Sequence, residues 1–311
     1  RLLLATGSTP FIPPLPGNDL QCVIGYRDIG DTQLMLDTAL THQHAVVVGG
    51  GLLGLEAANG LTLRGMQVTV IHKGQWLLDR QLDERAGKQL QTALERRGIR
   101  FRLGTPPKQL RGNKGGRVCA VDFNDGTSVA ADLVVMAAGI RPNIQLAERA
   151  GLACNGGILV NDTLQTFDPR IYAIGECVSH RGIAYGLVAP LFEQAKVCAN
   201  HLARLGYQRY LGSVTPTKLK VTGIDLFSVG DFMGAEGTES ITLNDPSSGV
   251  YKKLVLKADR LVGVCLYGDT ADNNWYLQLI SEARSIGHLR QHLMFGRPDP
   301  DDVMQQTKAV A

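Results

Sequence analysis

Residues 46–72, VVVGGGLLGLEAANGLTLRGMQVTVIH, decide the fold of this chain. They are typical of a strand, a glycine turn, a helix and a second strand. Gly49, Gly51 and Gly54 have the spacing G-x-G-x-x-G, which permits a tight turn, close approach of the backbone to a pyrophosphate, and close packing of helix on strand. The start of the helix would offer free N–H groups to the phosphates. We therefore predict a dinucleotide site; the alternative is a glycine-rich turn that only packs helix on sheet.

The end of the second strand bears on which nicotinamide cofactor is used. In NAD sites an acidic residue about 20 positions beyond the glycines holds the ribose 2′-OH, whereas basic residues accommodate a 2′-phosphate. Here the strand ends at Ile71, His72 and Lys73 without a carboxylate, and Asp79 is expected to lie too far into the next loop. A cationic Lys73 and a protonated His72 would suit a 2′-phosphate. The sequence thus favours NADPH over NADH; a solvated strand end that accepts either is the alternative.

Length, charge and cysteine spacing narrow the class of protein. The 311 residues allow two or three domains, and the 32 basic and 29 acidic residues are interspersed, which argues against a nucleic-acid surface. No apolar run reaches the roughly 18 residues of a membrane span, and no secretory signal is present, so the cytoplasm is the expected compartment and no membrane partner is expected. The six cysteines form no C-x-x-C pair. We expect no metal knuckle, disulfide framework or redox dithiol.

The first residues are unusual for the start of a protein. A buried-type strand at residues 2–5 runs into the turn Thr6-Gly7-Ser8. Because such a strand needs neighbours on both sides, we expect the chain to be cut on its N-terminal side from a longer one. A helix is expected over Asp28–Leu40, with Asp28 or Asp31 as its N-cap.

From Ala45 to about Ile140 strands and helices alternate, as βαβ units require. Beyond that point the pattern becomes β-rich after Pro216. The remaining expected elements are a helix over 83–97, a strand over 99–103, a hairpin with its turn at 124–126, strands over 133–138 and 171–175, a helix over 190–205, hairpins at 219–230 and 250–269, and a helix near 273–286.

Three signals together indicate a family. ATGS at 5–8, the glycine fingerprint and YAIGE at 172–176 resemble the two-dinucleotide flavoprotein reductases, the family of glutathione, rubredoxin and ferredoxin reductases. The resemblance implies an α/β fold with two Rossmann-like dinucleotide-binding domains, the FAD one incomplete, and a small α+β C-terminal domain. The implied division is 1–40 and 141–212 for the partial FAD-binding domain, 41–140 for the NAD(P)-binding Rossmann domain, 213–297 for the C-terminal interface domain and 298–311 for a tail or linker.

Longer strings are similar to a narrower group. These strings are RQLD (80–83), IYAIGECVSHRG (171–182), AYGLVAP (184–190), KLKVTGIDLFSVGDF (218–232), GVYKKLV (249–255) and LYGDTADNNWYLQLI (266–280). The group is the flavin module of assimilatory NAD(P)H nitrite reductase large subunits and of assimilatory nitrate reductase electron-transfer subunits. The resemblance implies hydride transfer from NAD(P)H to FAD, then single electrons to iron–sulfur and sirohaem centres outside this segment. Without an FAD glycine turn before residue 1, the segment is expected to bind FAD weakly or not at all and to be inactive on nitrite alone.

The resemblance assigns roles on the nicotinamide side. The backbone that would cradle the NAD(P) pyrophosphate comprises Gly49, Gly51, Leu52, Leu53 and Gly54. Glu56 would place a carboxylate near the nicotinamide as the catalytic residue, the alternative being a first-turn acid favoured by the helix dipole. Gly139 would line the nicotinamide side, and His72 and Lys73 would contact the 2′ position.

The resemblance also assigns roles on the flavin side. Glu176 stands where the broad family usually has an aspartate that holds the ribityl or phosphate region of FAD, with a structural cap as the alternative. The other implied FAD contacts are Thr6, Gly7, Gly175, Leu187 and Val188. Without metal-ligand spacing, four further residues are expected to be structural or at the surface, namely His42, His44, Cys177 and His180.

Two other functions stay open from the sequence. One is a free-standing ferredoxin- or rubredoxin-type reductase, and the other is a nucleotide-binding fragment without turnover. The expected partners are a nicotinamide dinucleotide and downstream redox domains or an electron-acceptor protein, with a homodimer as a further expectation. Nucleic acid is not expected as a partner.

Overall fold

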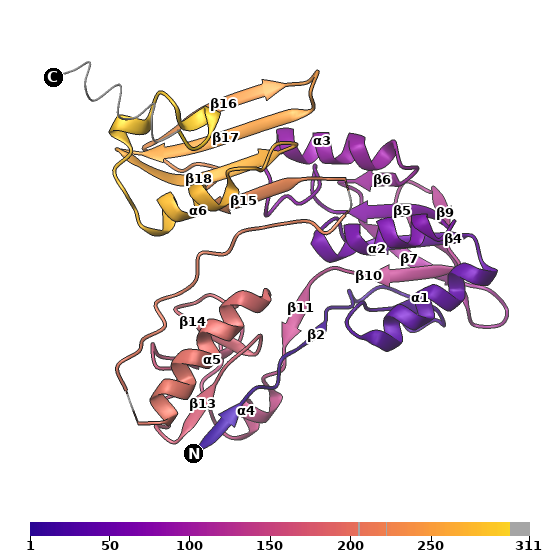
Figure 1. The fold of residues 1–311 in the computed structure, drawn as a ribbon. Helices are drawn as coiled ribbons and strands as arrows, with labels where there is room; N and C mark the ends of the chain where they lie inside the picture. The colour runs from indigo at the N-terminus through magenta and orange to yellow at the C-terminus, as the bar shows by residue number, and fades with distance from the viewer. Residues whose placement is uncertain (205, 222, 299–311) are drawn as a thin grey trace. The chain divides into compact units, whose positions relative to one another are not determined.

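The computed structural model describes residues 1–204, 206–221 and 223–298 (Figure 1). The helices are α1 (Ile29–Thr41), α2 (Leu52–Leu63), α3 (Glu84–Glu95), α4 (Gln145–Arg149), α5 (Val188–Leu202), α6 (Asn273–Ser281) and the 3-10 turns η1 (Gly287–Leu289) and η2 (Leu293–Phe295). The strands are β1 (Leu2–Leu4), β2 (Ser8–Pro10), β3 (Val23–Ile24), β4 (His44–Val48), β5 (Gln67–His72), β6 (Arg100–Leu103), β7 (Pro107–Gly112), β8 (Val118–Phe123), β9 (Ser128–Ala130), β10 (Leu133–Met136), β11 (Ile140–Pro142), β12 (Ile158–Val160), β13 (Ile171–Ala173), β14 (Val178–His180), β15 (Leu226–Gly230), β16 (Thr238–Asp245), β17 (Val250–Lys257) and β18 (Arg260–Tyr267).

A parallel sheet follows the glycine-turn pattern predicted from the sequence. Its strand order is β3-β10-β4-β5-β6, with parallel pairing of β10 to both β3 and β4, and of β5 to β6. All four residues of β10 are buried, as are Ala45 to Val48 of β4. Such continuous apolar burial is typical of parallel strands covered on both faces. The α/β fold class is confirmed.

The chain divides into two compact units. The first comprises residues 1–49, 64–66 and 107–215, and the second comprises 50–63, 67–106 and the residues from Pro216 onward. In the first unit β1 pairs in parallel with β13, and β12 with β14. The same unit holds the antiparallel sheet β7-β8-β9 and the pair β2 and β11. The domain boundaries expected from the sequence remain a prediction.

The C-terminal part of the second unit is a four-stranded antiparallel sheet with order β15-β18-β17-β16. Helix α6 packs on this sheet, as Figure 1 shows for the yellow helix beside β18. Its core consists of buried side chains from the strands and from α6 and η2, among them Phe227, Leu254, Val264, Tyr276 and Leu293. This is the small α+β C-terminal domain that the resemblance implied.

Helix starts follow the expected capping chemistry. Asp28 and Asp31 form a reciprocal capping box at α1, so both residues named in the prediction take part. Asp83 caps α3 by accepting from the backbone N–H of Ala86 at 3.1 Å. The helix expected over 83–97 is thus shorter, because the first residue caps it and the last turn ends at Glu95.

Some elements differ from the prediction. In the described part of the hairpin expected at 219–230 there is one strand, β15, and before it Gly223 has a φ of +74° and the N–H of Ile224 closes a turn on Val221. Strand β16 was not predicted, and since none of its side chains is fully buried its hydrophobic pattern is weak. Helix α6 ends at Ser281 instead of about residue 286. The tail expected at 298–311 lies, beyond residue 298, outside the described residues.

Candidate functional site

The glycine turn has the geometry that a phosphate cradle needs. Gly49 has a φ of +132°, and a Cβ there would lie 2.2 Å from the carbonyl oxygen of Ala137, so only glycine fits. A Cβ on Gly51 would meet no atom within 4 Å, which leaves open space on that side of the turn. Helix α2 then begins at Leu52, and the N–H groups of its first turn have no partner within the helix. These residues fit the pyrophosphate of a dinucleotide.

The start of α2 places the other predicted contacts of this cradle. Leu52 and Leu53 are its first two residues, and Leu53 is exposed. Gly54 is buried in the same turn, as expected of a glycine that permits close helix packing. Leu52 is half-buried and Leu53 exposed, whereas the third glycine packs inside the fold.

His72 lies beneath the glycine turn instead of facing solvent. The N–H of Gly50 donates to His72 Nδ1 at 3.2 Å, and the residue is 8% exposed. Burial lowers the pKa of His72 below its usual 6.5, against a smaller opposing effect of Asp79. Burial and the hydrogen bond that Nδ1 accepts both favour the neutral ring over the protonated His72 suggested by the sequence. Its predicted contact with the cofactor remains a prediction, as does that of the exposed Lys73.

Asp79 lies closer to the strand end than the sequence suggested. Its Oδ1 is 3.4 Å from His72 Nε2, although the geometry is not that of a hydrogen bond and Nε2 has no hydrogen-bond partner among the described residues. The expectation that Asp79 lies too far into the loop is therefore wrong. The loop after β5 folds back toward the glycine turn and brings a carboxylate beside His72.

Glu56 lies in the body of α2. It is the fifth residue of the helix, and the first turn contains no acid, so the alternative of a first-turn acid does not hold. Its Oε1 accepts from the backbone N–H of Lys220 at 3.1 Å. Glu56 therefore has a structural bond within the second unit, and its proximity to a nicotinamide remains a prediction.

In the first unit Glu176 lies in a polar cluster. Its Oε2 accepts from Ser8 Oγ at 2.7 Å and from Arg27 Nη2 at 2.6 Å. The preceding Gly175 donates its N–H to Oε1 of the buried Gln194 at 2.9 Å. The cluster thus joins the segment after β1 to the segment after β13. Sequence reasoning missed Ser8, Arg27 and Gln194, because their partners are distant in the chain and no local pattern marks them.

Thr6, Gly7 and Gly139 lie in a second set of loop contacts. Thr6 Oγ1 donates to the carbonyl of Asn143 at 2.6 Å, and the N–H of Asn143 donates to the carbonyl of Gly7 at 2.9 Å. Gly7 and Gly139 have φ values of +66° and +112°, and a Cβ on either would meet no atom within 4 Å. Open backbone of this kind permits close approach of a ligand.

Helix α5 presents an uncapped start. Leu187 is its extended N-cap residue without a side-chain cap, and Val188 is its first helical residue. Leu187, Val188 and Phe192 are 39%, 66% and 65% exposed. A helix N-terminus beside apolar side chains fits a flat apolar ring with a polar edge. Together with the Glu176 cluster and the open glycines, the first unit therefore fits the isoalloxazine and polyol parts of FAD.

The histidines and the cysteine that could have been metal ligands or acid–base groups have structural surroundings. His180 is buried, and its Nε2 lies 2.9 Å from Asp162, which also binds Arg181 through both oxygens. The hydrogen bonds from Arg181 and His180 lower the pKa of Asp162 to about 2. Cys177 is buried as well, and His44 lies 3.4 Å from Asp132. Within residues 1–204, 206–221 and 223–298 no group of three or more potential ligand side chains could hold a metal ion.

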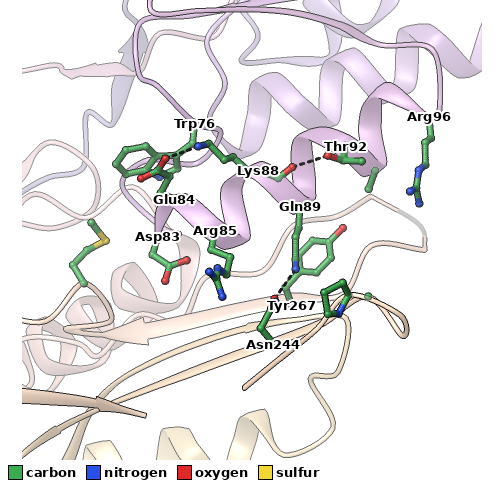
Figure 2. A pocket seen from close by; sticks show the side chains of 14 residues that line it. Trp76, Asp83, Glu84, Arg85, Lys88, Gln89, Thr92, Arg96, Asn244 and Tyr267 are labelled. Carbon is green, nitrogen blue, oxygen red and sulfur yellow. Dashed lines mark hydrogen bonds and ion pairs between the residues drawn. The ribbon is translucent and has the colours of Figure 1, made fainter. Parts of the chain in front are cut away.

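A separate pocket of about 960 Å³ lies between α3 and the C-terminal strands of the second unit (Figure 2). It is lined by Trp76, Asp83, Glu84, Arg85, Lys88, Gln89, Thr92, Ala93, Arg96, Met233, Asn244, Pro246, Gly249 and Tyr267. Gln89 reaches Asn244 across it at 3.3 Å. None of the predicted cofactor residues lines this pocket, so it is distinct from the dinucleotide turn.

The turn, the parallel sheet and the Glu176 cluster define a dinucleotide-binding α/β protein. Residues 1–201 match the family described as pyridine nucleotide-disulphide oxidoreductase, and residues 216–284 match the rubredoxin NAD+ reductase C-terminal domain. The chain belongs to the pyridine nucleotide-disulphide oxidoreductase family. This confirms the family predicted from the ATGS, glycine and YAIGE signals.

Two curated relatives from Bacillus subtilis (strain 168) support the narrower resemblance. The chain is 50% identical to a nitrite reductase [NAD(P)H] over 92% of its own length and 35% of the relative's. It is 45% identical to an assimilatory nitrate reductase electron transfer subunit over 94% of its length and 38% of the relative's. The chain thus spans somewhat over a third of these relatives.

Solved structures share the fold. A ferredoxin reductase for the CYP199A2 system from Rhodopseudomonas palustris superposes with a TM-score of 0.83 at 25% identity, covering 92% of this chain and 71% of that one. Putidaredoxin reductase in its covalent complex with putidaredoxin gives 0.81 at 27% identity, covering 91% and 69%. As for membranes, none of the helices in the described part combines the length and apolarity needed to cross one.

Proposed function

We propose that the chain is the electron-entry module of an NAD(P)H-dependent flavoprotein reductase that supplies nitrite or nitrate reduction. The observation that carries the proposal is the glycine turn that opens α2, with Gly49 in a position that admits no side chain. The polar cluster at Glu176 supports the flavin part of the proposal. The nitrite and nitrate part is supported by the similarity to the two Bacillus subtilis relatives.

Each group of residues has a distinct task in this proposal. When bound, FAD accepts a hydride from the nicotinamide and releases electrons singly. The backbone at Leu52 and Leu53 would bind the NAD(P)H pyrophosphate, because a helix start favours anions. Glu56 would orient the nicotinamide end, and Gly139 would leave room beside it. Positioning of this kind is the main contribution a protein makes to hydride transfer.

On the flavin side, Glu176 would accept hydrogen bonds from polyol hydroxyls of FAD. Its orientation is fixed by Ser8 and Arg27, both of which donate to Oε2, so Oε1 is the oxygen left for a ligand. Gly7 and Gly175 would let the ligand approach the backbone, and the start of α5 at Leu187 and Val188 would face the ring edge. The glutamate side chain, which is longer than the aspartate usual in the broad family, is thus held in place by two hydrogen-bond donors.

The proposal also covers the choice of nicotinamide cofactor, the electron acceptor, the compartment and the assembly. The sequence alone favours NADPH, although the position of Asp79 opposes that preference. Iron–sulfur and sirohaem groups are expected in other domains of such a protein. The acceptor would be those domains or a separate redox protein. The cytoplasm and a homodimer are the expected compartment and assembly.

A second function is favoured by one observation. Residues 216–284 match the rubredoxin NAD+ reductase C-terminal domain, which suits a reductase that serves a separate small acceptor protein. A nucleotide-binding part without turnover is the third alternative. The three differ in what happens to reducing equivalents after NAD(P)H binds.

The test uses the protein as its gene encodes it, purified and titrated anaerobically with NADPH or NADH. Flavin bleaching that nitrite then reverses would support the proposal. Flavin bleaching that a ferredoxin or rubredoxin reverses, and nitrite does not, would favour the second function. Nucleotide binding without any bleaching would leave only the third.

A further inference from the structure

We propose that Asp79 is a specificity-determining residue that disfavours the 2′-phosphate of NADPH and so shifts the nicotinamide site toward NADH. This inference rests on the proposed function, because it concerns the same dinucleotide site. It opposes the NADPH preference expected from the sequence, which assumed that no carboxylate reaches the end of β5.

The backbone, rather than sequence proximity, brings Asp79 to the strand end. The preceding Leu78 is fully buried with a φ of +53°, and its N–H donates to the carbonyl of Gly50 in the glycine turn at 3.0 Å. The carbonyl of Leu78 accepts from the N–H groups of Gln81 and Leu82, each at 2.7 Å. A left-handed leucine held by three hydrogen bonds fixes the loop, so the position of the next residue is well determined.

The same turn also holds His72 in a buried position. Gly50 donates its N–H to His72 Nδ1 and accepts from Leu78, so one residue of the glycine turn anchors both the strand end and the loop. The imidazole is 9% exposed, whereas the side chain of Asp79 is 31% exposed. Of the two, Asp79 is the one a ribose can reach.

Gly74 makes room for the carboxylate. A Cβ on Gly74 would lie 2.5 Å from Asp79 Oδ2 and 2.7 Å from His72 Nε2. The N–H of Gly104 holds this segment by donating to the carbonyls of His72 and Gly74, at 2.9 and 3.1 Å. The glycine therefore leaves a space at the strand end that the carboxylate fills.

The charge of this carboxylate distinguishes the two cofactors. The ribose 2′-OH of NADH can donate to a carboxylate, as the strand-end acid of NAD sites accepts it. A 2′-phosphate at the same place would be repelled by Asp79, whereas Lys73 and Arg80, exposed cations of the same loop, would attract it. Removing the negative charge should leave those two cations unopposed and improve NADPH binding selectively.

The experiment measures the dissociation constants of NADH and NADPH by calorimetry on the whole chain, which needs no flavin turnover. For Asp79→Asn, we expect the affinity for NADPH relative to NADH to rise about tenfold, the effect of removing one like-charge contact. Asp79→Glu keeps the charge and should stay near the parent ratio. Asp19→Asn is the matched control, since Asp19 is exposed and lies in the other unit.

The outcomes separate the two claims. An unchanged ratio in Asp79→Asn, with both nucleotides bound, would overturn the role of Asp79 and leave the proposed function in place. Binding of neither nucleotide by the parent chain would overturn the proposed function and this inference with it. An equal rise in Asp19→Asn would show a general charge effect and likewise overturn the assignment. Thermal unfolding of each variant checks that the chain is folded.

Discussion

Glu56 combines a structural bond with a predicted role near the nicotinamide, and one pair of substitutions separates them. Glu56→Gln keeps an oxygen that can accept from the N–H of Lys220, so the free energy of unfolding should change little. If the carboxylate acts on the nicotinamide, the rate of flavin reduction in the same variant should fall by on the order of tenfold or more. Stopped-flow reduction and chemical denaturation measure the two quantities.

Glu56→Ala is the matched control for this prediction. It removes both functions, so it should lower the free energy of unfolding by about 1 kcal/mol as well as slow flavin reduction. A Glu56→Gln variant that reduces flavin at the parent rate would contradict the catalytic role and leave Glu56 as a structural residue.

His72 should make the stability of the chain sensitive to acid. Its pKa in the folded chain lies below the usual 6.5, so the unfolded chain binds the proton more readily. Stability is therefore full above about pH 6.5 and falls as the pH drops toward the folded-state pKa. Chemical denaturation at about pH 7.5 and about pH 5.5 measures this loss.

His72→Asn isolates the contribution of that one histidine. The asparagine oxygen can still accept from the N–H of Gly50, but it does not titrate. The variant should lose less stability than the parent between the two pH values. An equal loss would show that other groups cause the acid sensitivity.

At the scale of elements, Asp83 links α3 to the C-terminal sheet of the second unit. Its Oδ1 caps α3 through the N–H of Ala86, and its Oδ2 accepts from the buried Tyr251 hydroxyl at 2.5 Å. Burial, with the Asp83 hydrogen bond next, raises the pKa of Tyr251. Lys253 Nζ lies 3.7 Å from the same oxygen. One carboxylate thus satisfies groups on a helix and on β17.

Asp83→Ala should therefore lower the free energy of unfolding by about 2–4 kcal/mol, since a cap is lost and a buried hydroxyl is left without its acceptor. Urea denaturation measures this change. Tyr251→Phe removes only the hydroxyl and should cost less. If Asp83→Ala were no more destabilising than Tyr251→Phe, the cap would contribute nothing and the two-element role would be wrong.

Elements with a strong local signal were predictable, and those fixed by distant contacts were not. The capping box at Asp28 and the apolar runs of β4 and β10 are readable from neighbouring residues alone. Strand β16 is the edge strand of its sheet and pairs along one edge, with β17. Its side chains are exposed or half-buried, so its alternation of apolar and polar residues is weak. Its existence depends on pairing with β17, which no local pattern encodes.

The same distinction applies to the candidate site. The glycine turn was predictable because the G-x-G-x-x-G spacing is the one that a tight, phosphate-binding turn requires. The position of Asp79 was not, since it depends on the bond from Leu78 to Gly50, and neither was the bond from Arg27 to Glu176. Each joins residues far apart in the chain, so only the folded backbone reveals it.

At the scale of the whole molecule, the proposed reaction draws on residues of both units. The first holds the residues that fit FAD together with Gly49 and Gly139, and the second holds the start of α2 and the end of β5, which fit NAD(P)H. Each group has its own internal contacts. Hydride transfer needs both, and this is the claim on which the proposed function depends.

The most direct test of that claim is rapid anaerobic mixing of the protein as its gene encodes it, in the presence of excess FAD, with NADH or NADPH, followed by flavin absorbance. We expect bleaching that is faster than with FAD and nucleotide alone and that saturates as the nucleotide concentration rises. Bleaching at the protein-free rate with both nucleotides would contradict that claim, because the two sets of residues would then not bring nicotinamide and flavin together.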